Sequence, residues 1–396
     1  MLNISKKNIV LLRQESFGST GLMRNPGIRF YLNKDETTLL IEKGLFPTDM
    51  QNKESFDYHL IYTEPKLLQN ANFSAPDTVF FEVTRACNLR CTHCFNDSGI
   101  KMGDELTHSE RMEVVADLVK TGVQEIRFTG GEPLALPGIY DLIELASSEG
   151  LRVSIGSNGV LIDKKVSAKL SRLGVNRVIV SLDGLKNEHD LIRGVGTYKK
   201  TLNALTALKE VGISTRINCV VMKSNLESIK ILISELLPQG HSLMIRRLIP
   251  SGRASEDWAE MLNQSDYRKL ENDLRDQVLK FGNLEGHYLF DKPTVTRIPL
   301  PFERRNCSAG HRGMVVMPNG LVQTCGFLGP LGEGALGKLP KEKMADIWER
   351  LNQSSHIATY QEMTADYNKN TPYPQTNCLA MGLASNNSSF VQIGRR

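Results

Sequence analysis

Residues 79–95 read VFFEVTRACNLRCTHCF and join an apolar run to a cluster of three cysteines. The run VFFEV is typical of a buried strand, and the turn after it holds Cys87, Cys91 and Cys94 at C-x3-C-x2-C spacing. Three thiolates in so short a loop can face one inorganic centre, and a [4Fe–4S] cube held by three cysteines keeps one iron free for another ligand. We therefore predict an iron–sulfur cluster with an open iron after this strand.

Clustered cysteines have two other common uses. Structural zinc needs four ligands, and His93, the candidate fourth ligand, lies between Cys91 and Cys94 in a loop too short for all four to converge easily. A disulfide framework is disfavoured by a total of seven cysteines and by the lack of a secretion signal. The spacing alone favours iron–sulfur and leaves zinc as the main alternative.

The composition is ordinary for a globular chain and bounds the possible partners. The 396 residues, 40% apolar and 23% charged, suggest two or three domains. A net charge of +4 without a basic run predicts no nucleic-acid partner. The apolar patch at residues 9–12 is too short for a signal peptide, and no stretch approaches the roughly 18 apolar residues of a membrane span. We expect a cytoplasmic protein with no membrane partner.

Strands and helices are predicted to alternate between residue 79 and about residue 250. The strands are expected at 79–84, 124–129, 151–156, 176–182, 214–221 and 243–248, and the helices near 107–121, 137–149, 163–173, 198–211 and 225–237. Thr107 and Glu110 form a capping-box pattern, and Asn225 is placed to cap the last helix. Helix stops are predicted at Gly122, Gly150, Gly174 and Gly212. Six such units predict an α/β fold, namely a partial (βα)6 TIM-like barrel.

Small and polar residues follow four successive strands, at the edge where parallel α/β folds place their chemistry. Tandem glycines at 130–131 let backbone N–H groups turn toward a ligand, and Glu132 could hold an ammonium group. Ser157, Ser181 and Asp183 could bond to a ribose or an amino-acid end. Each turn alone is common in such folds, but together they predict one pocket beside the cysteine loop.

The cysteine motif, GGEP, SNG and SLDG after successive strands resemble the radical S-adenosylmethionine (SAM) enzymes over about residues 78–250. In that family the free iron binds SAM, and reductive cleavage gives a 5′-deoxyadenosyl radical that removes a hydrogen atom from the substrate. The resemblance implies a [4Fe–4S] cluster on Cys87, Cys91 and Cys94. It implies SAM contacts from His93, Gly130, Gly131, Glu132, Pro133, Ser157, Ser181, Asp183 and Arg193. His93 would stack on the adenine, and Arg193 would pair with the SAM carboxylate.

Cys219 lies in the fifth strand, in the sequence INCVV. Some radical epimerases use an isolated cysteine as a hydrogen-atom donor, so Cys219 is a candidate catalytic residue. An apolar strand position more often holds a small buried side chain, which makes core packing the alternative.

Residues 1–72 are predicted to form a small α+β unit. Strands are expected at 9–13 and 28–32, joined across Gly18, Gly21 and Gly27, and Asn33-x-x-Glu36 starts a helix that Gly44 ends. The sequence LRQESFGSTGLMRNPGIRFYLNKDE loosely resembles the opening of a peptide-recognition domain found in maturases, which binds a leader peptide as an added strand. The alternative is an extension that only packs on the catalytic domain.

Residues 256–396 are predicted to hold a linker helix, near 264–281, and a second cysteine group. Cys307 and Cys325 flank two apolar runs joined by Asn319-Gly320, a strong hairpin signal, and Cys378 follows later. The pattern resembles the auxiliary-cluster (SPASM/twitch-like) domain of many radical enzymes and implies a second cluster on these three cysteines.

Two positions depart from the auxiliary-cluster pattern. Met381 stands where the single-cluster form commonly has a fourth cysteine, and Gly326 stands where some relatives carry a general base. A domain that holds no cluster, with its cysteines buried, is the alternative.

We therefore predict a radical SAM core at residues 73–255 that abstracts a hydrogen atom from a ribosomally made peptide. The predicted partners are a precursor peptide and an electron donor such as flavodoxin or ferredoxin. Two alternatives stay open. One is a dehydrogenase or epimerase of a small molecule such as an aminocyclitol or sugar, and the other is a non-catalytic iron–sulfur or zinc scaffold.

Overall fold

The computed structural model describes residues 8–25, 27–43, 58–65, 73–263, 265–266, 269–270, 272–273, 309–328 and 335–353. Several predictions fall outside these residues: those on Gly44, Cys307, Cys378 and Met381, and most of the predicted linker helix.

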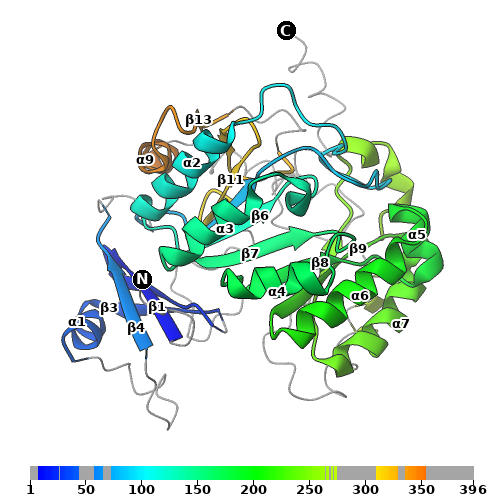
Figure 1. Ribbon diagram of the computed structural model, residues 1–396, viewed down its shortest axis with the longest axis horizontal. Coiled ribbons are helices and arrows are strands. Elements are labelled where there is room, and N and C mark those ends of the chain that lie inside the picture. Colours follow the sequence, from blue (N-terminus) through cyan, green and yellow to red (C-terminus); the bar gives the residue numbers. More distant parts are fainter. Residues whose placement is uncertain are drawn as a thin grey trace.

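The centre of the molecule is a nine-stranded sheet in the order β10-β9-β8-β7-β6-β5-β11-β12-β13. Six consecutive strands of the sheet run parallel and form the barrel: β5 (Thr78–Glu82), β6 (Glu125–Thr129), β7 (Arg152–Ser157), β8 (Arg177–Ser181), β9 (Ser214–Val221) and β10 (Ser242–Arg247). The connecting helices are α2 (His108–Thr121), α3 (Ile139–Ser148), α4 (Lys164–Arg172), α5 (Lys186–Arg193), α6 (Thr197–Glu210) and α7 (Leu226–Leu236). The predicted partial (βα)6 arrangement is confirmed, with the helices covering the outer side of the sheet (Figure 1).

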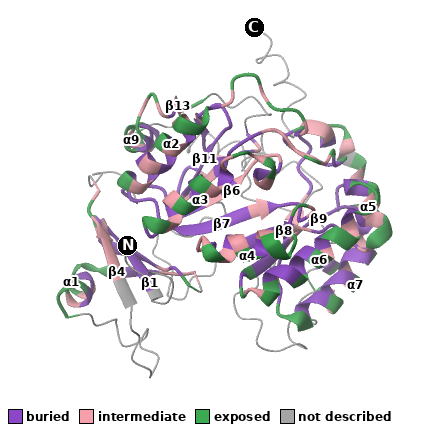
Figure 2. Cartoon of the chain, viewed as in Figure 1, coloured by how far each residue is buried: buried purple, intermediate pink, exposed green. Residues whose placement is uncertain are grey.

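Side chains alternate between two faces along each parallel strand. One set, which includes Val79, Phe128, Ile155 and Val180, forms a single apolar core with the helices. This buried layer appears as the purple strands and inner helix faces in Figure 2. The residues between them point to the inner, concave side of the sheet, where ligands of barrel-like folds bind.

The predicted helix signals are largely confirmed. Thr107 and Glu110 form the capping box of α2, and the four predicted glycine stops all have positive φ just after α2, α3, α4 and α6. Asn225 precedes α7 but does not cap it, which corrects the prediction. Its Oδ1 instead accepts from the Met222 N–H at 2.7 Å, and its Nδ2 donates to the Asp183 and Val220 carbonyls.

Helix α5 was not predicted from the sequence, although its residues were recognised as a motif. The segment KNEHDLIR carries few apolar residues, so the helical period of its buried side is weak. Its buried side is formed by His189, Ile192 and Arg193, two of which are polar.

The N-terminal unit holds a four-stranded sheet in the order β3-β2-β1-β4, with one helix. Its elements are β1 (Asn8–Glu15), β2 (Gly18–Met23), β3 (Ile28–Asn33), α1 (Lys34–Lys43) and β4 (Tyr58–Thr63). The prediction of two strands joined across glycines was wrong, because the glycine-rich segment is itself strand β2. A Cβ on Gly21 would lie 2.0 Å from the Phe30 ring, so this glycine makes room for a core side chain that propensity does not reveal.

Buried charges join the N-terminal unit to the amino-terminal edge of the main sheet. Arg13 is completely buried, and its guanidinium donates to Glu15 at 2.7 Å and to Asp77 at 2.8 Å. Arg29 donates to Gln124 at 2.8 Å, just before β6. The N-terminal unit therefore contacts the amino-terminal ends of the parallel strands, whereas the cysteine loop follows the carboxyl-terminal end of β5.

The described part of the C-terminal region extends the main sheet. The predicted hairpin is confirmed: β11 (Gly313–Val316) pairs antiparallel with β12 (Leu321–Gln323), and Gly320 has φ 84°. Strand β11 pairs parallel with β5, and β13 (Gly337–Lys338) follows β12 in the sheet. Helix α9 (Met344–Gln353) buries Trp348, whose indole N–H donates to the Phe73 carbonyl at 2.9 Å.

No helix in the described ranges is both long and apolar enough to cross a membrane.

Candidate functional site

Each thiol of the cysteine loop has an N–H donor beside it. The Leu89 backbone N–H lies 3.4 Å from Cys87 Sγ, the Ser98 N–H lies 3.4 Å from Cys94 Sγ, and Arg193 Nη1 lies 3.7 Å from Cys91 Sγ. Hydrogen bonds of this kind to cysteine sulfur are among the features by which proteins tune iron–sulfur clusters.

Burial makes the free thiolates unfavourable in this loop. It raises the pKa of Cys87 to about 11 and also raises the pKa of Cys91. A metal centre favours the thiolate outright, and the N–H groups beside the three sulfurs suit sulfur anions. These features fit an iron–sulfur cluster.

Across the described residues, no three His, Cys, Asp or Glu side chains are grouped closely enough to hold one metal ion. The ligands of one zinc ion must converge at about 2.3 Å, whereas the cysteines of a cube bind separate irons.

Arg253, for which no role was predicted, holds the cysteine loop through hydrogen bonds from the segment after β10. Its Nε donates to the Cys91 carbonyl at 2.7 Å, and its backbone N–H donates to the Cys94 carbonyl at 2.9 Å. It lies in the 3-10 turn Gly252–Ala254 that follows β10, and this position beyond the carboxyl end of a strand was the signal available in the sequence.

The glycine pair after β6 packs against the cysteine loop. The N–H of Gly131 donates to the Thr84 carbonyl at 2.7 Å, and the N–H of Glu132 donates to the Ala86 carbonyl at 2.9 Å. A Cβ on Gly131 would lie 2.1 Å from the Ala86 carbonyl oxygen. The N–H groups of Gly131 and Glu132 therefore hold two loops together, and glycine is needed at 131 for the close approach. The contact of Gly130 and Gly131 with the cofactor stays a prediction.

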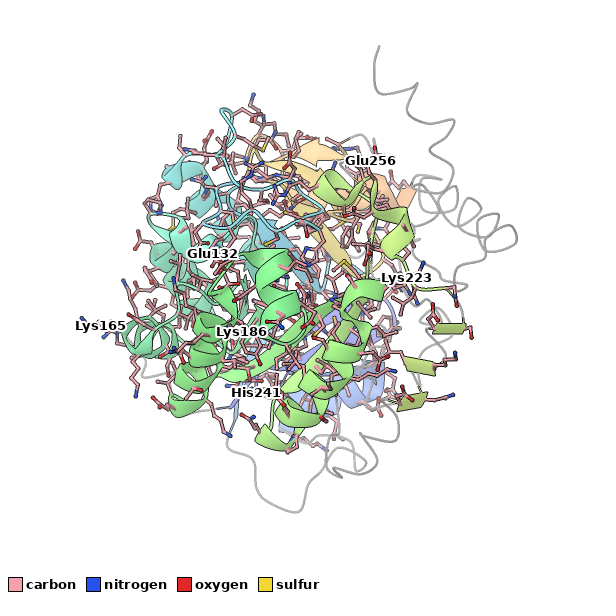
Figure 3. The ribbon with its side chains drawn as sticks, turned by 90° about the vertical axis from the view of Figure 1, so that its right-hand side faces the viewer. Glu132, Lys165, Lys186, Lys223, His241 and Glu256 are labelled. Atoms are coloured by element: carbon pink, nitrogen blue, oxygen red, sulfur yellow. The ribbon has the colours of Figure 1, made fainter. Side chains whose placement is uncertain are left out.

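Glu132 is completely buried and already bonded. Its carboxylate accepts from Ser157 Oγ at 2.9 Å, from the Asn158 N–H at 2.8 Å and from the Leu134 N–H at 3.2 Å. Burial raises the pKa of Glu132 to about 7 despite these donors. Figure 3 shows Glu132 inward of the helices, in contrast to Lys165 at the periphery. Glu132 thus joins the loops after β6 and β7, and its contact with an ammonium group stays a prediction.

Pro133 and Ser157 complete this junction. Pro133 begins the short 3-10 turn Pro133–Ala135, which Glu132 caps. Ser157 Oγ donates to Glu132 and accepts from the Gly159 N–H at 3.0 Å, so both predicted residues order the loops.

Asn158, for which no role was predicted, connects Glu132 to the cysteine loop. Its Nδ2 donates to Asn88 Oδ1 at 2.8 Å and lies 3.9 Å from Cys87 Sγ. The SNG sequence that marks the end of β7 is the signal that could have identified it.

Asp183 is a buried carboxylate that joins three segments of the site, namely the cysteine loop, α5 and β9. Its completely buried carboxylate accepts from Arg193 Nε at 2.6 Å and from the Val220 N–H at 2.8 Å, and it lies 2.7 Å from His93 Nε2. Burial alone would raise the pKa of Asp183, but Arg193 and His93 hold it well below its usual range. His93 and Arg193 therefore share a bond to Asp183, and their contacts with the adenine and the carboxylate of SAM stay predictions.

Ser181 and Cys219 point to opposite faces of the sheet. Ser181 ends β8 and alternates with Val178 and Val180 of the helix-facing core, so it lies on the inner face. Cys219 is completely buried within that core, and its Sγ lies 2.8 Å from the Leu182 carbonyl oxygen. The position supports core packing, the alternative to hydrogen-atom donation.

The C-terminal hairpin reaches the cysteine loop. Cys325 is half-buried after β12, and the nearby Phe327 ring lies 4.4 Å from the Phe95 ring, measured between centroids. Gly326 faces Glu82, because a Cβ there would lie 2.9 Å from Glu82 Oε1. The structure thus places Cys325 in a segment that contacts the predicted radical site.

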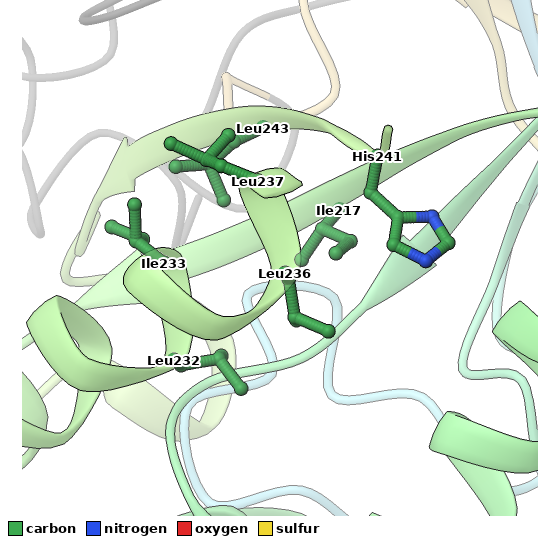
Figure 4. Close-up of a pocket in the computed structure, with 7 residues that line it drawn as sticks. All are labelled: Ile217, Leu232, Ile233, Leu236, Leu237, His241 and Leu243. Carbon is green, nitrogen blue, oxygen red and sulfur yellow. The ribbon is translucent and has the colours of Figure 1, made fainter. Parts of the chain in front are cut away.

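A separate apolar pocket lies between α7 and strands β9 and β10 (Figure 4). It is lined by Ile217, Leu232, Ile233, Leu236, Leu237, His241 and Leu243. It leaves no room for a water molecule and belongs to the helix-facing core, so it offers no second site.

Comparison with known families agrees with this geometry. Residues 81–236, from β5 through α7, match the radical SAM superfamily. The chain belongs to this superfamily, whose members use a [4Fe–4S] cluster and SAM.

Relatives within the superfamily include mycofactocin maturases and AdoMet-dependent heme synthases. Mycofactocin maturase MftC of Mycobacterium ulcerans is 31% identical over 269 residues, which cover 66% of this chain and 72% of that protein. AdoMet-dependent heme synthase of Oleidesulfovibrio alaskensis is 28% identical over 317 residues, which cover 75% of this chain and 80% of that protein.

Solved structures share the fold over most of the chain. Streptococcus suis SuiB bound to S-adenosylmethionine has a TM-score of 0.68 at 19% identity and covers 89% of each chain. The anSMEcpe structure with bound AdoMet and the Cp18Cys peptide has a TM-score of 0.56 at 19% identity and covers 80% of this chain and 98% of that chain.

Proposed function

We propose that this radical SAM enzyme is a peptide maturase, which abstracts a hydrogen atom from a residue of a ribosomally made precursor peptide. The observation that carries the proposal is the N-terminal sheet, which is fixed to the barrel and ends in strands β3 and β4. Within the described residues each of these strands pairs on one side only. An unpaired strand edge can bind an extended peptide through backbone hydrogen bonds.

Two comparisons support a peptide substrate. The 31% identity to mycofactocin maturase extends over two thirds of both chains. SuiB has been solved with its precursor peptide SuiA, and its fold covers 86% of this chain at 18% identity. A fold match at this identity does not define a substrate, so the proposal depends on the maturase relative and the N-terminal sheet together.

In the proposed mechanism, Cys87, Cys91 and Cys94 would hold the radical cluster, and the cluster with bound SAM would supply the radical chemistry for hydrogen-atom abstraction. The protein positions this centre through two buried networks. Glu132 connects the loops after β6 and β7, and Asp183 fixes Arg193 next to Cys91. Fully bonded buried networks of this kind resist movement of the loops that they join.

The C-terminal cysteines are proposed to hold an auxiliary cluster. Cys325 follows a confirmed hairpin whose next residues contact Glu82 and Phe95. A second cluster held in this segment would adjoin the radical site. An electron donor such as flavodoxin or ferredoxin is proposed to reduce the radical cluster.

Heme synthesis is a second candidate function, because the AdoMet-dependent heme synthases match at similar identity and coverage. In that case the substrate would be a tetrapyrrole, and the N-terminal unit would serve only as a packing extension.

One experiment separates these functions. The reconstituted protein is incubated anaerobically with SAM, a reductant and either a precursor peptide encoded by a neighbouring gene or an iron-bound coproporphyrin. Mass spectrometry then follows each substrate. We expect a mass change in the peptide that depends on Cys91, with Cys91→Ala as the inactive comparison. Conversion of the porphyrin alone would refute the maturase proposal.

A further inference from the structure

The turn that follows β10 lies against the cysteine loop. Its residues Gly252–Ala254 bring Arg253 next to residues 91–98, which hold two of the three predicted cluster ligands. Gly252 has φ 60°, and a Cβ at this position would overlap with the Phe95 carbonyl oxygen. Glycine at 252 therefore makes the close contact between the two segments possible.

Arg253 bonds to the loop at four points. Its backbone N–H donates to the Cys94 carbonyl at 2.9 Å, and its Nε donates to the Cys91 carbonyl at 2.7 Å. Its Nη1 donates to the Asp97 carboxylate at 2.6 Å and to the Ser98 carbonyl at 2.8 Å. Because the planar guanidinium holds its donors in a fixed fork, these bonds fix the loop residues relative to one another.

Asp97 gives the loop an unusual backbone turn beside a predicted cluster ligand. Its φ is 49°, and it is the only described residue other than glycine with a positive φ. This left-handed conformation is less favourable for aspartate than the right-handed one. The following N–H, that of Ser98, lies 3.4 Å from Cys94 Sγ. Arg253 bonds to both Asp97 and Ser98, so it holds this turn and the N–H donor that the turn directs at the sulfur.

The turn that carries Arg253 is itself firmly packed. Ala254, the next residue, is completely buried in a small apolar core with Leu248, Met261 and Leu328. Leu328 comes from the segment after β12, so the C-terminal hairpin supports the turn from the side away from the loop. A side chain can fix a neighbouring loop only when its own backbone is held in place, and this core supplies that support.

Arg253 also places a positive charge beside the loop. Its side chain is 18% exposed, so water screens this charge less than it would at a fully exposed position. Reduction adds a negative charge to an iron–sulfur cluster, and both a nearby cation and N–H donors to the sulfurs favour the reduced state. Movement of the Ser98 N–H away from Cys94 Sγ would therefore make reduction less favourable.

We propose that Arg253 is a positioning residue for radical generation, which holds Cys91, Cys94 and the Ser98 N–H in place and thereby sets the reduction potential of the radical cluster. The inference rests on the cluster of the proposed function and is independent of the choice between peptide and tetrapyrrole. Hydrogen bonds from a charged donor are stronger than neutral ones, which suits a residue that must hold a loop in one arrangement.

The test compares the full-length wild type with Arg253→Gln, Arg253→Lys and Arg90→Gln. Arg90 is the matched control, because it lies 3.8 Å from the same Asp97 carboxylate but its side chain is 63% exposed. A redox titration of the reconstituted proteins, followed by electron paramagnetic resonance, measures the midpoint potential of the cluster whose signal changes when SAM is added. Hydrogen exchange of the metal-free chains measures how firmly residues 91–98 are held.

We expect cluster reduction to be about tenfold less favourable in Arg253→Gln, which is a shift of about 59 mV to a more negative potential for one electron. The amides of residues 91–98 should exchange about tenfold faster in this variant. Arg253→Lys should change in the same direction in both measurements, because an ammonium group keeps the charge but cannot reproduce the fork of donors. Arg90→Gln should keep the wild-type values.

Other results overturn the inference in distinguishable ways. Wild-type exchange of residues 91–98 in Arg253→Gln refutes the positioning role, and this measurement requires no bound iron. A wild-type potential in Arg253→Lys shows that the charge alone acts, which also refutes it. If Arg253→Gln binds no iron, Arg253→Lys supplies the potential. A wild type that binds no iron refutes the proposed function instead, whereas the exchange rates still decide whether Arg253 holds the loop.

Discussion

Replacing Asp183 with asparagine should destabilise the protein far more than an isosteric change normally does. The carboxylate of Asp183 is completely buried and accepts from Arg193 Nε at 2.6 Å and from the Val220 N–H at 2.8 Å. Asparagine fills the same space and can still accept from Val220. It removes the negative charge beside Arg193, so the guanidinium is left buried without its counter-ion.

The magnitude follows from that loss. Removing one partner of a buried ion pair costs about 3 to 5 kcal/mol, and no cavity contributes because the volumes match. A typical domain is stable by about 5 to 15 kcal/mol, so the change should be easy to detect. Because Arg193 also lies 3.7 Å from Cys91 Sγ, the variant should also retain less iron after reconstitution.

Urea unfolding of the metal-free chain measures the first effect. The matched control is Asp346→Asn, which changes an exposed carboxylate in α9 and should alter stability by less than about 0.5 kcal/mol. If Asp183→Asn costs less than about 1 kcal/mol, the buried ion pair does not have the role described here.

Three further predictions follow from other contacts. Gly131→Ala should lose most of its iron in an iron assay, because the new Cβ would meet the Ala86 carbonyl oxygen at 2.1 Å, whereas Gly103→Ala, with open space around it, should keep its iron. Burial alone would raise the pKa of Asp77, but Arg312, Arg29 and Arg13 hold it well below the ordinary value near 4. The folded state therefore gains stability from this carboxylate above pH 4 and loses it as the pH falls, so urea midpoints measured from pH 7 to pH 3 should fall less steeply for Asp77→Asn than for the wild type. Cys325→Ala should lower the iron content of the reconstituted chain from about eight to about four atoms, taking four per cube, and an unchanged content would argue against an auxiliary cluster on this residue.

The parallel fold was readable from the sequence because its signals are local. Alternating apolar runs, the Thr107 capping box and the glycine stops each depend on neighbours in the chain, and all are present in the structure. Strand β2 was missed because its glycines have low strand propensity. Gly21 is needed there because the Phe30 ring of the neighbouring strand leaves no room for a Cβ, and this contact is not visible in the sequence.

The sequence predicted where the site lies but not which contacts its residues make. The motifs identified the correct sheet edge, but the partners of Glu132, Asp183 and Arg193 come from distant segments. Each of these side chains bonds to the protein in the structure, and its expected contact with SAM stays a prediction.

The central claim, that Cys87, Cys91 and Cys94 hold a radical-generating cluster, is tested most directly by one measurement. The chain is reconstituted anaerobically, mixed with SAM and a reductant, and assayed for 5′-deoxyadenosine by chromatography. The wild type and Cys219→Ala, whose thiol lies in the helix-facing core, should both form 5′-deoxyadenosine, and Cys91→Ala should form none. Zinc bound in place of iron, or equal product from Cys91→Ala, would contradict the account.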